Sequence, residues 1–152
     1  MTARPLPYAK TSDGVPALRD PHMNWLVRSA LAILFPPTGD LPGVDNGGLD
    51  AFVARFRRET PWLLWLGVVM GAMVFHLTPA LTVHVPLPAF LLSPALADKH
   101  ADRIAGSRWY LIRQAIFILK LPGGMAWGAD PAVREQFALA PMERDPGTWR
   151  TS

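Results

Sequence analysis

Pro61-Trp-Leu-Leu-Trp-Leu-Gly-Val-Val-Met-Gly-Ala-Met-Val-Phe-His-Leu77 is apolar along nearly its whole length, and no Asp, Glu, Lys or Arg occurs from Thr60 to Ala97. The segment predicts one helix without a polar face. Because every Å² of apolar surface left in water costs about 25 cal/mol, such a helix has to be buried in protein or in lipid. The chain is therefore expected to enter a membrane or to bury this helix against a partner.

Two features of the segment bear on how it packs. At 1.5 Å per residue the helix would be about 26 Å long, slightly short of the roughly 30 Å hydrocarbon core of a bilayer. Gly67 and Gly71 have the G-x-x-x-G spacing that lets a second helix approach closely. Beyond the helix, Pro79, Pro86 and Pro88 prevent a regular continuation. We expect this irregular apolar backbone to be covered by protein or to lie near an interface.

The composition is that of one small helical domain. The 152 residues are 50% hydrophobic and 18% charged, with 16 prolines, which indicates helical segments separated by proline breaks. The formal net charge is only +3, so we do not expect nucleic-acid binding. The chain has no cysteine, which excludes disulfides, thiolate metal sites, iron–sulfur clusters and covalently attached haem.

A basic cluster of Arg55, Arg57 and Arg58 directly precedes the apolar segment. It fits a membrane flank that faces lipid headgroups, and a solvated helix end equally well. The first ten residues lack the apolar core of a signal peptide and lack a twin arginine, so we expect no signal peptide of its own. We expect a membrane-associated protein on the cytoplasmic side of the inner membrane rather than in the periplasm.

Apolar periodicity and capping residues predict further helices on both sides of this segment. The expected helices cover residues 22–34, 49–59, 61–77, 94–105 and 108–120, with a short one from 131 to about 137. Pro122, Gly123 and Gly124 are expected to end the fifth of these helices. The prediction is an all-α domain of about five helices over residues 21–138, with an apolar segment at 61–92. A proline-rich extended arm (1–20) precedes it and a polar tail (139–152) follows it.

No catalytic motif is present, and the histidines are the main candidates for chemistry. His76 and His84 lie in the apolar segment, where two imidazoles can ligate haem or a metal. No carboxylate or third histidine lies near them in sequence, so we interpret each as a packed side chain with one hydrogen bond to the backbone. Asp98, His100 and Asp102 form a polar cluster that we interpret as solvated helix surface, with His100 pointing away from the two aspartates.

Several short motifs occur in an order that is similar to a known family. They are Leu34-Phe-Pro-Pro-Thr-Gly39, a Gly-Val-Asp turn, Leu49-Asp-Ala-Phe-Val-Ala-Arg-Phe56, Phe90-Leu-Leu-Ser-Pro94, Ile104-Ala-Gly-Ser-Arg108, Leu111-Ile-Arg-Gln114, Leu119-Lys120, Ala129-Asp-Pro-Ala-Val-Arg134 and Gln136-Phe137. Their order resembles the gluconate 2-dehydrogenase subunit 3-like proteins, the small helical subunits of flavin-dependent GMC-type dehydrogenases. A related region precedes the flavin domain of long-chain fatty alcohol oxidases. The chain departs from the family pattern at residues 121–128 and in the stronger apolar character of the helix from Pro61.

The resemblance implies a non-catalytic accessory subunit of a membrane-associated, FAD-dependent GMC-type oxidoreductase that acts on alcohols, such as a fatty alcohol or a sterol. Its role would be to stabilise and anchor a large flavoprotein subunit, which would carry the FAD, while this chain would bind no cofactor or metal. The expected helix-packing and partner contacts are Gly67, Gly71, Trp62, Trp65, Trp109, Ile112 and Ile116. The alternative is a small integral membrane subunit of a larger assembly unrelated to flavin enzymes, with residues 61–77 as its span.

Overall fold

The structure is a computed structural model that describes residues 21–45 and 47–140. Its elements are α1 (Pro21–Leu34), α2 (Leu49–Glu59), α3 (Trp62–Leu77), α4 (Pro79–Thr82), the 3-10 helix η2 (Ala89–Leu91), α5 (Pro94–Ala105), α6 (Tyr110–Ala129) and α7 (Pro131–Gln136). All of these elements are helical, which confirms the predicted all-α class within the described ranges. The predicted N-terminal arm and nearly all of the predicted C-terminal tail lie outside the described residues.

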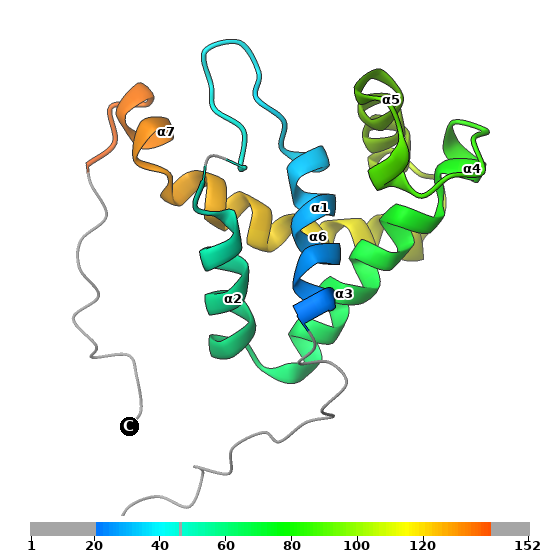
Figure 1. Cartoon of the computed structure of the whole chain (residues 1–152), viewed down its shortest axis with the longest axis horizontal. Coiled ribbons are helices and arrows are strands. Elements are labelled where there is room, and N and C mark those ends of the chain that lie inside the picture. The colour runs from blue at the N-terminus through cyan, green and yellow to red at the C-terminus, as the bar shows by residue number, and fades with distance from the viewer. Residues whose placement is uncertain (1–20, 46, 141–152) are drawn as a thin grey trace, which may run out of the picture.

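The long helix α6 organises the fold. It contacts α1, α2, α3, α5 and α7. Figure 1 shows α6 running behind the other helices, with α2 and α7 toward one end of the molecule and α4 and α5 toward the other. The helix α3 packs against both α1 and α6, so the apolar segment lies at the centre of the fold rather than beside it.

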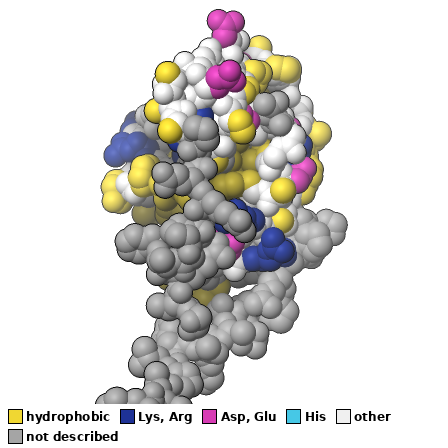
Figure 2. All heavy atoms as spheres, turned by 90° about the vertical axis from the view of Figure 1, so that its left-hand side faces the viewer, with side chains coloured by type: hydrophobic (Ala, Val, Ile, Leu, Met, Phe, Trp, Pro, Cys, Tyr) yellow, Lys and Arg dark blue, Asp and Glu magenta, His cyan; other side chains and the backbone are white. Residues whose placement is uncertain are grey.

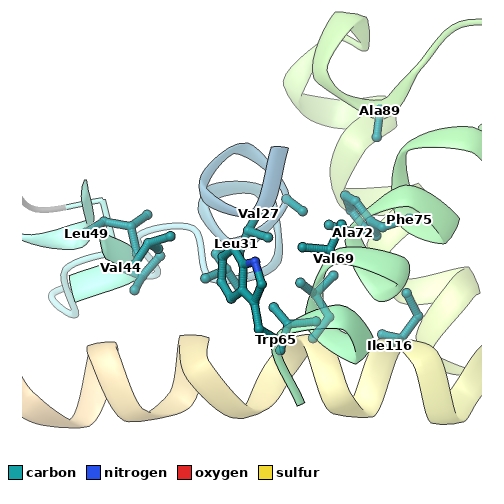
Figure 3. Packing of buried hydrophobic residues seen from close by; sticks show 14 of the residues in the cluster. Val27, Leu31, Val44, Leu49, Trp65, Val69, Ala72, Phe75, Ala89 and Ile116 are labelled. Carbon is teal, nitrogen blue, oxygen red and sulfur yellow. The ribbon is translucent and has the colours of Figure 1, made fainter. Parts of the chain in front are cut away.

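The core is built where α1, α3 and α6 meet, and α2 extends it. Figure 3 shows the side chains of Val27, Leu31, Trp65, Val69 and Ile116 pointing into this region. Val27, Leu31, Val68, Ala72 and Phe75 are among the residues with no exposed surface. The loop before α2 contributes Val44, and the first residue of α2 contributes Leu49.

Only one side of α3 is covered by this core. Trp65, Val68, Ala72 and Phe75 are buried, at spacings of three and four residues. The opposite side is exposed, and Leu63 keeps 64% of its surface. The chain therefore does not bury this helix all round. Among the described residues, no helix combines the length and hydropathy needed to cross a membrane, so the predicted span over residues 61–77 is not supported.

The prediction that Pro122 ends the fifth predicted helix is wrong, because α6 continues to Ala129. A proline inside a helix costs about 3 kcal/mol or more, since it removes one backbone hydrogen bond and its ring crowds the preceding turn. Here Pro122 and Gly123 are buried. A Cβ built on Gly123 would lie 2.3 Å from Cε2 of Phe35. The absence of that side chain lets α6 pack closely on the end of α1, and this packing offsets the local preference to stop.

Local signals place the ends of α6 and α7. The Asp130 carboxylate accepts a hydrogen bond of 2.8 Å from the Ala132 backbone N–H and caps α7, which begins at Pro131 as predicted. At the other end, the Ser107 hydroxyl accepts a bond of 3.2 Å from the Trp109 N–H. The helix begins at Tyr110 rather than at residue 108.

Candidate functional site

The two glycines of the G-x-x-x-G pair both face α6 of the same chain. A Cβ on Gly71 would lie 2.5 Å from the carbonyl oxygen of Ala115 and 3.0 Å from Cβ of Leu119. A Cβ on Gly67 would lie 3.4 Å from a methyl group of Ile118. The predicted close helix contact is therefore present. Its nearest atoms belong to the chain's own α6, so the assignment of these glycines to a partner contact is corrected.

The other predicted contact residues fall into two groups. Trp65 and Ile116 are buried in the core, at 3% and 2% exposure, so they stabilise the fold and are not available to a partner. Trp62 and Trp109 are exposed, at 46% and 61%. Ile112 is half-buried against the core. Among the predicted contact residues, Trp62 and Trp109 therefore have the largest exposed fractions and are the most accessible to a partner.

Exposed apolar side chains are concentrated on the two helices that pack against each other. We call the following residues the exposed α3–α6 side chains: Trp62, Leu63, Leu64, Met70, Met73, Leu77, Tyr110, Leu111, Phe117, Leu121 and Met125. Leu77 and Leu111 keep 69% and 80% of their surface. Hydrophobic side chains also reach the surface at the end of the molecule shown in Figure 2, between basic and acidic groups. Monomeric soluble proteins rarely expose apolar patches beyond a few hundred Å², so a large apolar surface marks an interaction site.

The predicted basic cluster is not a uniform cationic patch. Arg55 forms an ion pair of 3.1 Å with Glu59 one helical turn away. Arg57 is half-buried, and Arg58 is exposed. Nearby, Arg28 of α1 contacts Asp45 and Asp50, at 2.8 Å and 2.9 Å, and so ties α1 to α2 and the loop before it. A headgroup-facing role of the cluster remains a proposal that concerns Arg58 above all.

Two histidines are buried on either side of Phe75. His76 keeps 2% of its surface and His100 keeps none. Their rings lie 5.6 Å and 4.7 Å from the ring of Phe75. The row continues from His76 to Phe90 at 5.3 Å and from Phe90 to Trp25 at 5.0 Å. Five rings from α1, α3, α5 and η2 are thus packed in sequence.

Each buried histidine is held by backbone carbonyls. Nε2 of His100 donates to the Phe75 carbonyl at 2.8 Å, and its Nδ1 accepts from the Thr82 hydroxyl at 2.5 Å. Nε2 of His76 donates to the Leu26 carbonyl at 3.1 Å and lies 3.0 Å from the Ser29 hydroxyl. Since a carbonyl only accepts, both Nε2 atoms carry a proton in the neutral ring. The packed, hydrogen-bonded state predicted for His76 is confirmed.

Burial lowers the pKa of both imidazoles. For His76 the hydrogen bond to Leu26 partly offsets this effect, and a charge on His100 would lower the pKa further. For His100 the hydrogen bond to Phe75 is the offsetting contribution. Both rings are therefore neutral near pH 7, and they act as polar links between helices.

Two predictions about histidines are corrected. His100 is not part of a solvated surface, because it lies with Ala97 and Ile104 on the buried side of α5. That spacing of three and four residues is visible in the sequence and could have identified it. His84 is exposed, with a backbone φ of 60°, rather than packed. Among the described residues, no group of three or more His, Cys, Asp or Glu side chains could hold a metal ion.

A pocket of about 370 Å³ lies beside the buried His100. Its apolar wall comes from Leu81, Ile104, Trp109 and Ile112, which include two of the predicted contact residues. Hydroxyl groups of Thr78, Thr82 and Ser107 and the side chains of Arg103 and Arg108 also line it. The pocket is therefore apolar on one side and cationic on another, and its hydroxyl at Thr82 is the one bonded to His100.

Comparisons with protein-family models, with curated proteins and with solved structures found no match to the chain. The resemblance to the small subunits of GMC-type dehydrogenases therefore rests on the sequence motifs alone.

Proposed function

We propose that this chain is a non-catalytic accessory subunit of a membrane-associated, FAD-dependent GMC-type oxidoreductase that acts on alcohols, including apolar ones. In this proposal the exposed α3–α6 side chains pack against the large flavoprotein subunit, which carries the FAD and the catalysis. The observation that supports it is the exposed side of α3, where Leu63, Met70 and Leu77 remain in water although the helix has no charged residue.

The number of exposed apolar side chains on α3 and α6 is enough for a stable contact. Burying one leucine or phenylalanine side chain contributes about 1.5–3 kcal/mol, whereas association costs roughly 4–15 kcal/mol in lost freedom of movement. One such residue would not offset that cost, and two would do so only at the low end of that range. Several of the exposed α3–α6 side chains therefore have to be buried together. The large flavoprotein subunit that the resemblance implies is a partner with enough surface to bury them.

The test is co-purification of the tagged chain from its native host, with identification of the proteins it retains. A stoichiometric large subunit with flavin absorbance and GMC-type sequence is the expected result. If the complex contains no flavoprotein, the proposed function is wrong.

Surface variants then locate the contact. Leu63→Gln with Phe117→Gln is expected to abolish retention of the flavoprotein, because both side chains are exposed, at 64% and 60%, and their loss removes apolar contact without touching the core. Leu91→Gln in η2 is the matched control, since Leu91 is 59% exposed but lies on neither helix of the pair. Far-UV circular dichroism checks that all three proteins keep their helix content. Equal retention by the wild-type chain, the double variant and the Leu91→Gln control would place the contact elsewhere.

A further inference from the structure

The pocket beside His100 is formed by two stretches of the chain, residues 78–82 and 103–112. Thr78 follows α3, and Leu81 and Thr82 belong to α4. Arg103 and Ile104 lie in the last turn of α5, and the other lining residues lead into the first turn of α6: Ser107, Arg108, Trp109 and Ile112. In Figure 1 these elements meet at the end of the molecule where α4 and α5 lie. A volume of about 370 Å³ is within the range of small-molecule sites, which are mostly apolar with a few convergent polar groups.

The polar groups of the pocket favour an anion. Arg103 donates to the Thr82 carbonyl, which fixes its guanidinium at the rim. Arg108 lines the pocket and has no ion pair or hydrogen bond with the described part of the chain. No acidic side chain is among the described residues that line the pocket. The charge there is therefore positive and is not neutralised within the pocket.

The first turn of α6 adds to this positive potential. The N-cap residue is Trp109, whose side chain makes no capping hydrogen bond. The Trp109 N–H is bonded to the Ser107 hydroxyl, whereas the N-cap side chain bonds none of the amides of the first turn. These amides, together with the helix dipole, favour negative charge at that end. Trp109 and Ile112 also supply apolar surface at the same place. A bound molecule would meet cationic and apolar groups within one cavity.

We propose that this pocket binds a carboxylate attached to an apolar body, of the class of medium-chain fatty acids. The carboxylate lies between Arg103 and Arg108, and the hydrocarbon chain packs on Leu81, Ile104 and Trp109. The hydroxyl of Ser107 accepts a hydrogen bond from the Trp109 N–H and is a further donor for the carboxylate, whereas the Thr78 hydroxyl already donates to the Val74 carbonyl at 2.7 Å. The inference does not depend on the flavoprotein partner, because every residue in it belongs to this chain.

The test uses the full chain at low concentration and bromoundecanoate as the probe. Bromine quenches tryptophan fluorescence on contact, so binding is expected to produce saturable quenching that is largely lost in Trp109→Phe. Bromoundecanol, which has the same chain without the carboxylate, is expected to bind far more weakly. Inorganic phosphate tests whether an anion alone is sufficient, and weak competition is expected because it lacks the apolar body.

Two variants separate the pocket from general apolar binding. Arg108→Gln is expected to weaken binding of the acid by about tenfold, the effect of losing one charge-assisted hydrogen bond. Arg58→Gln, which removes the same charge from α2, is the control and is expected to change nothing. Leu81→Trp fills the pocket from an exposed position, at 71% exposure, and is expected to prevent binding without unfolding the chain. The proposal is wrong if the acid and the alcohol bind equally, or if Arg108→Gln and Arg58→Gln behave alike.

Discussion

Replacing each glycine of the G-x-x-x-G pair by alanine separates helix propensity from helix packing. Gly67 and Gly71 are both inside α3, so each alanine should gain about 1 kcal/mol from propensity alone. The two sites differ only in what the new methyl group meets on α6. At Gly67 it would make an ordinary contact of 3.4 Å with Ile118, and at Gly71 it would lie 2.5 Å from a backbone oxygen of Ala115.

The contact distances determine how much the two variants differ in stability. The methyl at position 67 fits the existing space, so Gly67→Ala is expected to stabilise the fold by about 0.5–1 kcal/mol. The methyl at position 71 meets backbone that cannot turn aside, so the two helices must move apart. Overpacking of this kind costs about 1–3 kcal/mol, and more where backbone must shift. Gly71→Ala is therefore expected to destabilise the fold by about 1–2 kcal/mol after the propensity gain.

The measurement is urea unfolding of the wild-type chain and both variants, followed by far-UV circular dichroism in a non-ionic detergent. The free energies of unfolding of the two variants should differ by about 1.5–3 kcal/mol, which corresponds to roughly 3–12 °C in melting temperature for a chain of this size. An equal gain in stability from both alanines would show that α3 and α6 do not approach as closely as described. A loss of stability in Gly67→Ala with no effect in Gly71→Ala would show that Gly67, and not Gly71, makes the tighter contact with α6.

Three further predictions follow from packing, burial and exposure. Gly123→Ala should destabilise the chain in urea unfolding because its methyl would meet Phe35, whereas Gly124→Ala, with nothing within 4 Å, should stabilise it by up to about 1 kcal/mol. Burial lowers the folded-state pKa of His76 and His100. Below about pH 6.5 the unfolded chain therefore binds more protons than the folded chain does. As the pH is lowered through this range, the free energy of unfolding should fall by at most about 1.4 kcal/mol per histidine per pH unit. His100→Gln should reduce this slope. Without detergent or partner the chain should self-associate as concentration rises, visible as increasing light scattering, and a monodisperse monomer at high concentration would contradict this.

The sequence predicted those elements whose signals are local. The bounds 49–59 match α2, because an amphipathic stripe ends just before Pro61. The cap at Asp130 and the start of α5 at Pro94 follow from short-range residue preferences. These signals need no knowledge of the rest of the chain, which is why they were sufficient.

The sequence was insufficient where distant segments decide the outcome. The spacing of Gly67 and Gly71 predicted a close helix contact but could not say that the contact is with α6. By its local sequence Pro122 predicts a helix end, but α6 continues because Phe35 and Leu31, from a distant part of the chain, pack on Gly123. The pocket depends on how α4, α5 and α6 meet, and no single motif encodes that. The flavoprotein partner and the membrane association stay predictions.

The position of α3 in the chain has a consequence for biosynthesis. Its buried side is covered by α1, which is made earlier, and by α6, which begins only at Tyr110. At about 5–20 residues per second, α3 leaves the ribosome seconds before the helix that packs on Gly71 exists. During that interval α1 has been made but α6 has not, so the side of α3 that α6 covers is open to water and to other nascent chains, as is the side that stays exposed. A chaperone, or a partner subunit made nearby at the same time, would shield the helix until α6 closes over it.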